Sequence, residues 1–127
     1  MKRINKEPII LNTENEVAIA TDYNAAACGA GFNQVVVAVG LYAIASITGF
    51  KSIAIATGQN SVASALKKNN LAIAWGSGAK VKGVLNSFIA AAGINADGNF
   101  DVQLKKVDGV SIMPDTWYSL SELTKIE

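Results

Sequence analysis

Residues 15–95 read, in rows of nine, NEVAIATDY, NAAACGAGF, NQVVVAVGL, YAIASITGF, KSIAIATGQ, NSVASALKK, NNLAIAWGS, GAKVKGVLN and SFIAAAGIN. In most rows the third and fourth residues are apolar and the eighth is often glycine. A unit of nine residues is long enough for one short strand and one tight turn. The repeat therefore predicts a parallel β-solenoid, an all-β single domain in which each row forms one strand.

A second period shows how many rows make one coil. The fifth residue alternates between branched apolar and small or polar types, in the order Ile19, Cys28, Val37, Ser46, Ile55, Ser64, Ile73 and Lys82. The true unit is then about eighteen residues, with two rows per coil and two parallel sheets. Each strand is expected to stack on the strand one coil away, about 4.8 Å along the axis.

Both faces of the predicted strands are apolar. Side chains alternate along a strand, so positions three and five share one face and positions four and six share the other. Burial stabilises by about 25 cal/mol per Å² of apolar surface, so we expect the larger residues at positions three and five to point inward. An alanine face is then left outside as the candidate oligomer face, formed by Ala18, Ala20, Ala54, Ala56, Ala72 and Ala74. The inverse packing exposes a Val and Ile stripe and predicts an oligomer even more strongly.

The two ends of the chain differ from the repeats. Residues 1–14 are expected to form an N-terminal lead-in strand and cap, with the strand at 9–11, and residues 96–127 a C-terminal cap. Lys80 and Lys82 stand at predicted core positions, which indicates that the pattern decays from Gly78 onward. In the cap, Asp108-Gly109 predicts a β-hairpin between strands at 100–107 and 110–112. Trp75 and Trp117 are expected to pack against this cap.

Composition excludes several kinds of chemistry. The chain has no His, so it lacks a Ser/His/Asp or Cys/His catalytic group and a His-liganded metal site. Only Asp22 occupies a repeat turn, which argues against calcium. The single cysteine, Cys28, cannot form an intrachain disulfide and is expected to be a small buried thiol. We therefore expect no enzyme activity, no metal and no cofactor.

Charge and hydropathy bear on partners and localisation. A net charge of +1 does not favour nucleic acid. The sequence shows no signal peptide and no apolar run long enough to span a membrane. A cytoplasmic location in the host cell is therefore expected rather than secretion.

Aromatic residues are the candidate binding residues, because binding hot spots are rich in them. They are Tyr23, Phe32 and Phe50 in the repeats and Trp117 and Tyr118 near the C-terminus. Successive rows lie on opposite sheets, so Tyr23 and Leu41 are expected along one edge and Phe32 and Phe50 along the other. Two interpretations stay open: a ladder that packs against the N-terminal segment, or an exposed contact patch.

The rows NSVASA, KSIAIATG and NNLAIAWG resemble the head repeats of trimeric autotransporter adhesins, which build a parallel β-roll that trimerises. The adhesin repeat is longer, and its signal peptide, coiled-coil stalk and membrane anchor have no counterpart in this sequence. The whole chain is more similar to small uncharacterised proteins of bacteriophages and Bacteroidetes. The shared segments are Lys82-Gly83-Val84-Leu85, Lys106-Val107-Asp108-Gly109 and Pro114-Asp115-Thr116-Trp117-Tyr118. This second resemblance implies no activity and no binding residues.

Three functional hypotheses follow from these patterns. The first is a non-enzymatic protein of a phage or mobile element that binds a host protein or small molecule stoichiometrically, for example to inhibit a defence system. The second is an adhesion or virion structural module of the autotransporter-head type. The third is a repeat scaffold or ice-binding-like surface, for which Thr21, Thr48 and Thr57 are too few and too irregular. In each case we expect a homo-oligomer.

Overall fold

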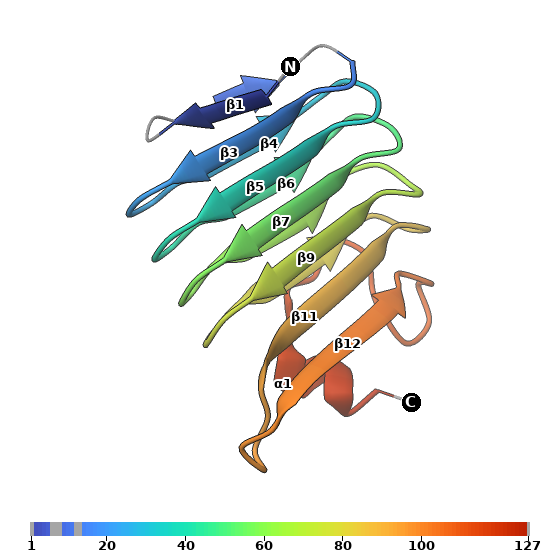
Figure 1. Ribbon diagram of the computed structural model, residues 1–127. Helices are drawn as coiled ribbons and strands as arrows, with labels where there is room; N and C mark the ends of the chain where they lie inside the picture. Colours follow the sequence, from blue (N-terminus) through green and yellow to red (C-terminus); the bar gives the residue numbers. More distant parts are fainter. Residues whose placement is uncertain (1, 6–8, 12–13, 127) are drawn as a thin grey trace.

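The structure is a parallel β-solenoid, seen in a computed structural model that describes residues 2–5, 9–11 and 14–126 (Figure 1). Strands alternate between two stacked sheets, here called sheet A and sheet B. Sheet A has seven strands in the order β1-β3-β5-β7-β9-β11-β12, and sheet B has six in the order β13-β10-β8-β6-β4-β2. The solenoid makes about 4 turns at a spacing of about 18 residues, which confirms the predicted fold and the two-row coil.

The strand bounds follow the predicted rows. Sheet A consists of β1 (Lys2–Asn5), β3 (Val17–Thr21), β5 (Val35–Val39), β7 (Ile53–Thr57), β9 (Leu71–Trp75), β11 (Phe88–Ile94) and β12 (Phe100–Lys106). Sheet B consists of β2 (Ile9–Leu11), β4 (Ala26–Gly29), β6 (Ile44–Ile47), β8 (Val62–Ala65), β10 (Lys80–Gly83) and β13 (Tyr118–Ser119). A short helix, α1 (Leu120–Thr124), ends the described chain. The predicted strand at 9–11 is confirmed as β2, whereas β1 was not expected, and residues 6–8 and 12–13 of the predicted cap lie outside the described residues.

Backbone conformation at the corners sets the period. A left-handed residue begins each row, with φ between 53° and 73°. These residues are Asn15, Asn24, Asn33, Tyr42, Lys51, Asn60, Asn69, Gly78 and Asn86. Asparagine tolerates this conformation better than other residues with a Cβ, which explains why it recurs there. The last of the nine shows that the final row begins at Asn86 and not at Ser87, so Phe88 pairs with Leu71, only 17 positions earlier. The prediction of an unbroken nine-residue period was wrong by this one residue.

Glycine at position eight follows from the close stacking of the corners between sheets A and B. At Gly58, with φ +132°, an added Cβ would lie 2.1 Å from the carbonyl oxygen of Gly40 in the preceding coil. Gly76 stands in the same relation to Gly58, at 2.2 Å. Any side chain at these positions would push successive coils apart.

The solenoid interior is lined by alanine, contrary to the sequence-based prediction. Ala18, Ala20, Ala54, Ala56, Ala72 and Ala74 are all fully buried, and the larger Val and Ile residues at positions three and five face outward. These alanines therefore do not form an outer oligomer face. Nine-residue arcs bring the sheets so close that alanine fills most interior positions, and larger residues such as Val36 and Ile47 are accommodated beside a glycine, Gly29. The added Cβ of Gly29 would already lie 3.0 Å from Ile47 and 3.2 Å from Val36.

The inverted packing also corrects the interpretation of β10. Lys80 and Lys82 face outward, and Val81 between them is fully buried. The repeat pattern therefore continues through β10. Cys28, expected to be buried, is half-buried on the outer face of sheet B, where its Sγ accepts a hydrogen bond from Ser46 Oγ at 3.3 Å.

A ladder of buried polar side chains runs along the corner between sheets B and A. Its members stand one residue before β3, β5, β7, β9 and β11, and they are Glu16, Gln34, Ser52, Asn70 and Ser87. Ser52 Oγ accepts from the Gln34 N–H at 3.1 Å, and Asn70 Oδ1 accepts from the Ser52 N–H at 3.0 Å. Asn70 Nδ2 donates to the Gly49 carbonyl. The ladder supplies hydrogen-bond partners to buried backbone N–H and C=O groups that the pairing of the strands does not use.

Replacing Asn70 by alanine should lower the free energy of unfolding by about 1–3 kcal/mol, because the Ser52 N–H and the Gly49 carbonyl lose their partner in a buried site. Urea denaturation followed by circular dichroism measures this change. The matched control is Gln59→Ala, which removes an exposed amide and should change stability by less than about 0.5 kcal/mol. Equal effects of the two substitutions would contradict a structural role for the ladder.

The predicted C-terminal hairpin is displaced along the chain. The hairpin joins β11 to β12, which pair antiparallel from Phe88–Lys106 to Ile94–Phe100. Its turn holds Asp97-Gly98, with the Gly98 N–H bonded to the Asn95 carbonyl at 3.0 Å. The dipeptide Asp108-Gly109 instead stands in a loop, where the Asp108 carboxylate accepts hydrogen bonds from the N–H groups of Val110, Ser111 and Ile112. These bonds hold the pKa of Asp108 below its usual value.

Helix α1 closes the C-terminal end of the solenoid (Figure 1). A capping box begins it: the Glu122 N–H donates to Ser119 Oγ at 3.3 Å, and the Ser119 N–H donates to Glu122 Oε1 at 3.0 Å. The hydrogen bond from the Ser119 backbone is the main reason that the pKa of Glu122 is lowered. Leu123 is fully buried in the core cluster, so the helix covers apolar side chains at the end of the solenoid.

Candidate functional site

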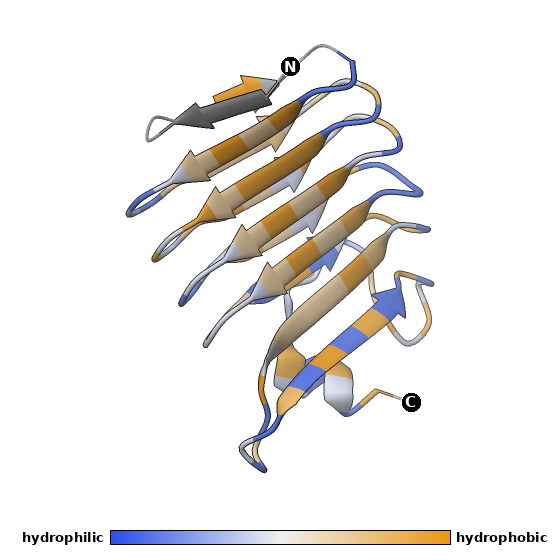
Figure 2. Ribbon diagram, viewed as in Figure 1, coloured by the Kyte–Doolittle hydropathy of each residue, from blue (hydrophilic) through white to orange (hydrophobic). Residues whose placement is uncertain are grey.

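The outer side of sheet A carries rows of aliphatic side chains. We call the surface formed by positions three and five the outer apolar face; its residues are Val17, Ile19, Val35, Val37, Ile53, Ile55, Leu71 and Ile73. All eight are half-buried or exposed. Parallel pairing places equivalent residues side by side, Val35 on Ile53 and Val37 on Ile55, so the surface is regular along the axis. Figure 2 shows these strands mainly in orange and tan, with blue, hydrophilic corners where the strands begin.

The same surface continues beyond the repeats. Partners in an antiparallel pair share a face, so the outward residues of β12 extend the surface next to β11. Phe100, Val102 and Leu104 are 55%, 49% and 59% exposed. Figure 2 shows apolar and polar positions alternating in orange and blue along β12. The apolar surface therefore runs from β3 to β12.

The predicted aromatic residues of the repeats lie on two opposite edges, as their row positions require. Phe32 and Phe50 stack with ring centroids 5.3 Å apart, and Lys67 Nζ lies 5.8 Å from the Phe50 ring. On the other edge Tyr23 contacts Tyr42 edge-on at 5.8 Å. Tyr23, Phe32 and Phe50 are 61%, 45% and 44% exposed, which supports the contact-patch interpretation. The two pairs do not form one site, because the body of the solenoid separates them.

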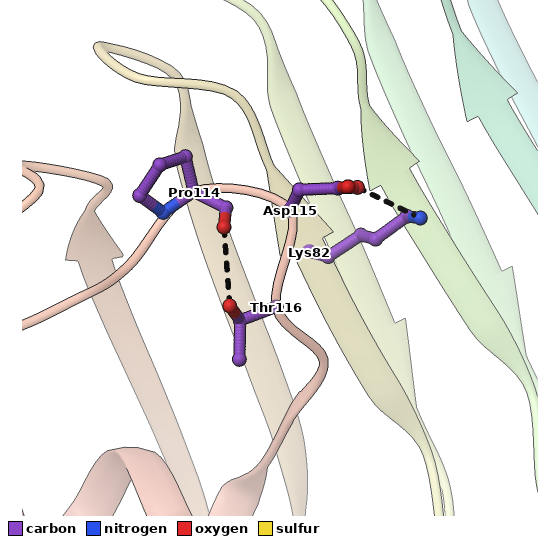
Figure 3. A network of polar contacts seen from close by, with 4 residues as sticks. All are labelled: Lys82, Pro114, Asp115 and Thr116. Carbon is purple, nitrogen blue, oxygen red and sulfur yellow. Dashed lines mark hydrogen bonds and ion pairs between the residues drawn. The ribbon is translucent and has the colours of Figure 1, made fainter.

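Trp117 and Tyr118 belong to the segment that leads into helix α1. The Tyr118 hydroxyl accepts a hydrogen bond from the Met113 N–H at 2.8 Å, and the ring packs against the core. Lys82 Nζ lies 4.8 Å from the centre of the Trp117 ring and 3.1 Å from Asp115 Oδ1. Figure 3 shows this ion pair beside the hydrogen bond from Thr116 to the Pro114 carbonyl. These contacts anchor the segment to β10, so we assign both aromatic residues a mainly structural role.

A cleft of about 720 Å³ lies beside the C-terminal cap and was not predicted. Three parts of the chain line it: the corner at 75–79, the hairpin turn with the start of β12, and helix α1. Its side chains include Trp75, Ile94, Asp97, Asp101, Ser121 and Lys125. Trp75 is 52% exposed and contacts Phe100 edge-on at 5.4 Å, which confirms the expected contact between Trp75 and the cap.

The described residues contain no cluster of three or more His, Cys, Asp or Glu side chains that could hold a metal ion. In this part of the chain no helix is long and apolar enough to cross a membrane. Comparison with protein-family models, curated proteins and solved structures found no match to this chain. The outer apolar face and the cleft are the two surface features of the described residues that could bind a partner or a ligand.

Proposed function

We propose that the chain is a non-enzymatic binding protein that acts as a closed homo-oligomer, with copies joined through the outer apolar face. The observation that carries the proposal is the composition of that face. Its eight residues, four strands deep, include no charged or polar side chain. Every copy of the chain carries this face, so the faces of two copies can pack against each other. Closed symmetric homo-oligomers are the usual outcome of such self-association.

The size of the surface from β3 to β12 supports this assignment. A five-residue strand is about 17 Å long, and six strands that each occupy about 4.8 Å cover about 29 Å, which gives roughly 500 Å² on each copy. Two such surfaces bury about 1,000 Å² in total, the lower limit for a specific protein interface. The eight residues of the outer apolar face offer no charge to an acidic or basic partner.

The bound target is proposed to be a component of a host cell. The similarity of the repeats and the C-terminal segment to small phage and Bacteroidetes proteins supports this choice. Stoichiometric binding suits a rigid solenoid with exposed aromatic pairs on both edges. Blocking of a host defence component is one action of this kind.

A second candidate is an adhesion or virion structural module. The outer apolar face favours it as well, because the adhesin heads that the repeats resemble assemble through their β-rolls. Detection of the protein on virions or at the cell surface would select this candidate over the first. An ice-binding surface is not favoured, since position seven along sheet A reads Thr21, Val39, Thr57 and Trp75, without a regular threonine row.

Replacing both Ile53 and Ile55 by lysine should dissociate the oligomer into folded monomers. The two residues lie at the centre of the outer apolar face, where the added charges would be buried against the second copy. Sedimentation velocity measures the mass, and circular dichroism confirms the fold. The matched control is Ile44→Lys, at the same row position on sheet B and 46% exposed, which should leave the mass unchanged. A variant with the wild-type mass would exclude this face as the interface.

A further inference from the structure

Strand β12 is the last strand of sheet A at the C-terminal end of the solenoid. After β11 the chain forms a hairpin instead of another corner, and no strand of the described residues pairs with the far edge of β12. Figure 1 shows β12 as the outermost strand of this sheet, with α1 behind it. The strand is seven residues long, Phe100–Lys106, and it contains no proline. A long, unpaired edge of this kind can accept a strand from a second chain.

The hydrogen bonds at the two ends of the hairpin show which backbone groups of β12 point to the free edge. The Asn95 N–H donates to the Asn99 carbonyl at 2.8 Å. At the other end the Val107 N–H donates to the Ser87 carbonyl at 2.9 Å, so the odd-numbered residues of β12 face β11. The residues whose N–H and C=O groups point away from β11 are therefore Phe100, Val102, Leu104 and Lys106. Within the described residues these groups have no hydrogen-bond partner.

The sequence of β12 is complementary to itself when it is read in the opposite direction. The strand reads FDVQLKK, and a two-fold axis at Gln103 places every residue opposite a residue of the same strand in a second copy. On the inner side, Asp101 then lies opposite Lys105 of the second copy, and the two Gln103 side chains lie opposite each other. On the outer side, Val102 lies opposite Leu104 of the second copy. Opposite charges and apolar pairs at facing positions stabilise neighbouring antiparallel strands.

Only one register of the two strands combines full overlap with paired charges. In this register even-numbered residues bond to even-numbered residues, so every free N–H and C=O group of the edge finds a partner. Asp101 and Lys105 face each other at a non-hydrogen-bonded position, where the two backbones are closest, at about 4.5 Å between Cα atoms. A shift by two residues in either direction would place one of these charges opposite Gln103 and would shorten the paired stretch.

The charges on the inner side of β12 make the edge selective. Within the described residues neither Asp101 nor Lys105 belongs to an ion pair. Asp101 accepts a hydrogen bond from Gln103 Nε2 at 3.4 Å, and Lys105 Nζ donates to the Ile126 carbonyl at 3.0 Å. An inward-pointing charge normally protects a free edge, because an arriving strand offers it no partner. A second copy of β12 does offer the opposite charge at the matching position, so the edge fits its own copy better than a neutral strand.

We propose that β12 pairs antiparallel with β12 of a second copy about an axis at Gln103. The axis is perpendicular to sheet A, so the outer apolar faces of the two copies lie side by side on one continuous sheet. Two such pairs then pack face to face as a closed tetramer, a common symmetric assembly. That contact buries about 2,000 Å² in total, twice the area for two single copies. The proposal rests on the self-association proposed above, because pairing along one strand edge is too weak to hold two copies alone.

Exchange of the two charges tests the pairing. The wild-type mass from light scattering should be four times the chain mass of 13.2 kDa. Asp101→Lys and Lys105→Asp should each halve that mass, because like charges then lie opposite each other, and the double variant should restore it. A role within one chain predicts no such rescue, since the two residues are about 13 Å apart along the strand. The control Glu14→Lys, an exposed residue near the other end of the chain, should keep the wild-type mass.

A disulfide tests the register directly. Chains that carry Gln103→Cys and Cys28→Ser should form a covalent dimer on mild oxidation, because the two Gln103 positions face each other at the axis. Their Cα separation of about 4.5 Å lies within the range of disulfides, about 4.4–6.8 Å. The matched control is Lys106→Cys with Cys28→Ser, at an exposed position on the same strand. It should run as a single chain on a non-reducing gel, because its symmetry mate is about 20 Å away.

Three results would overturn the strand pairing, each in proteins that circular dichroism shows to be folded. They are an unchanged mass for Asp101→Lys, a double variant that stays at half the mass, and the absence of the Gln103→Cys cross-link. Failure of the proposed interface looks different, because Ile53→Lys/Ile55→Lys would then keep the wild-type mass while the cross-link at Gln103 still forms.

Discussion

Replacing Ala54 by lysine should unfold the protein, whereas replacing its neighbour Ile55 by lysine should leave it folded. Ala54 is fully buried and lies between Val36 and Ala72 of the adjacent coils, where no space or partner exists for an ammonium group. Burial of an unpaired charge together with overpacking should cost at least about 4 kcal/mol, against a total stability of about 5–15 kcal/mol for a domain. Ile55 points outward, so its lysine remains near the surface of each copy.

Urea denaturation and circular dichroism of the two variants decide between the packings. The expected result is a lost or strongly weakened unfolding transition for Ala54→Lys and a cooperative one for Ile55→Lys. Because the substitutions are adjacent on one strand and introduce the same side chain, helix and strand propensities cannot explain a difference. The opposite outcome would restore the packing in which large residues point inward.

Deleting residues 51–68 should give a shorter protein that still folds. The deletion removes β7 and β8, one complete coil, and joins Phe50 to Asn69, another left-handed residue at the start of a row. Strand β9 then stacks on β5, and Asn70 takes the place of Ser52 next to Gln34 in the buried ladder. Stability in a solenoid is approximately a sum over repeats and their contacts, so the protein should lose stability but keep a cooperative transition.

Deleting only residues 51–59 is the matched control and should abolish folding. Every later strand would move to the opposite sheet, and Asn70 would leave the polar corner for the corner that Ala25 and Ala43 now occupy. Circular dichroism, size-exclusion chromatography and thermal unfolding compare the two deletions. Better tolerance of the nine-residue deletion would contradict the two-row coil.

The fold was predictable because the nine-residue pattern repeats along the chain. Which face of each strand points inward was also predictable, from the residue types found at each position rather than from the apolar area that burial would remove. Positions three and five include Lys80, Lys82, Ser46 and Ser64, whereas positions four and six hold only small or aliphatic residues between residues 17 and 83. Lysine cannot be buried in a thin alanine interior without a partner. The absence of lysine and serine at positions four and six therefore indicates that these positions point inward. It is a better guide than the average size of the side chains there.

The cap and the candidate site were harder to predict for different reasons. The chain contains two Asp-Gly dipeptides, at 97–98 and 108–109, and local turn chemistry alone does not show which one joins the strands. Helix α1 did have a signal, since Ser119 and Glu122 have the spacing of a capping box. The cleft had none, because it results from a corner that the chain does not form. Residues such as Trp75 and Asp101, which are distant in sequence, line it only because the hairpin turns away at Asn95.

The molar mass of the wild-type protein in solution is the most direct test of assembly through the outer apolar face. Light scattering on a size-exclusion column, over a wide range of loading concentrations, measures it against the chain mass of 13.2 kDa. We predict a single species that contains two or more chains. Its mass should not increase at high concentration, because a closed symmetric assembly leaves no outer apolar face uncovered. A monodisperse monomer at the highest concentration would show that the outer apolar face does not join copies of this chain.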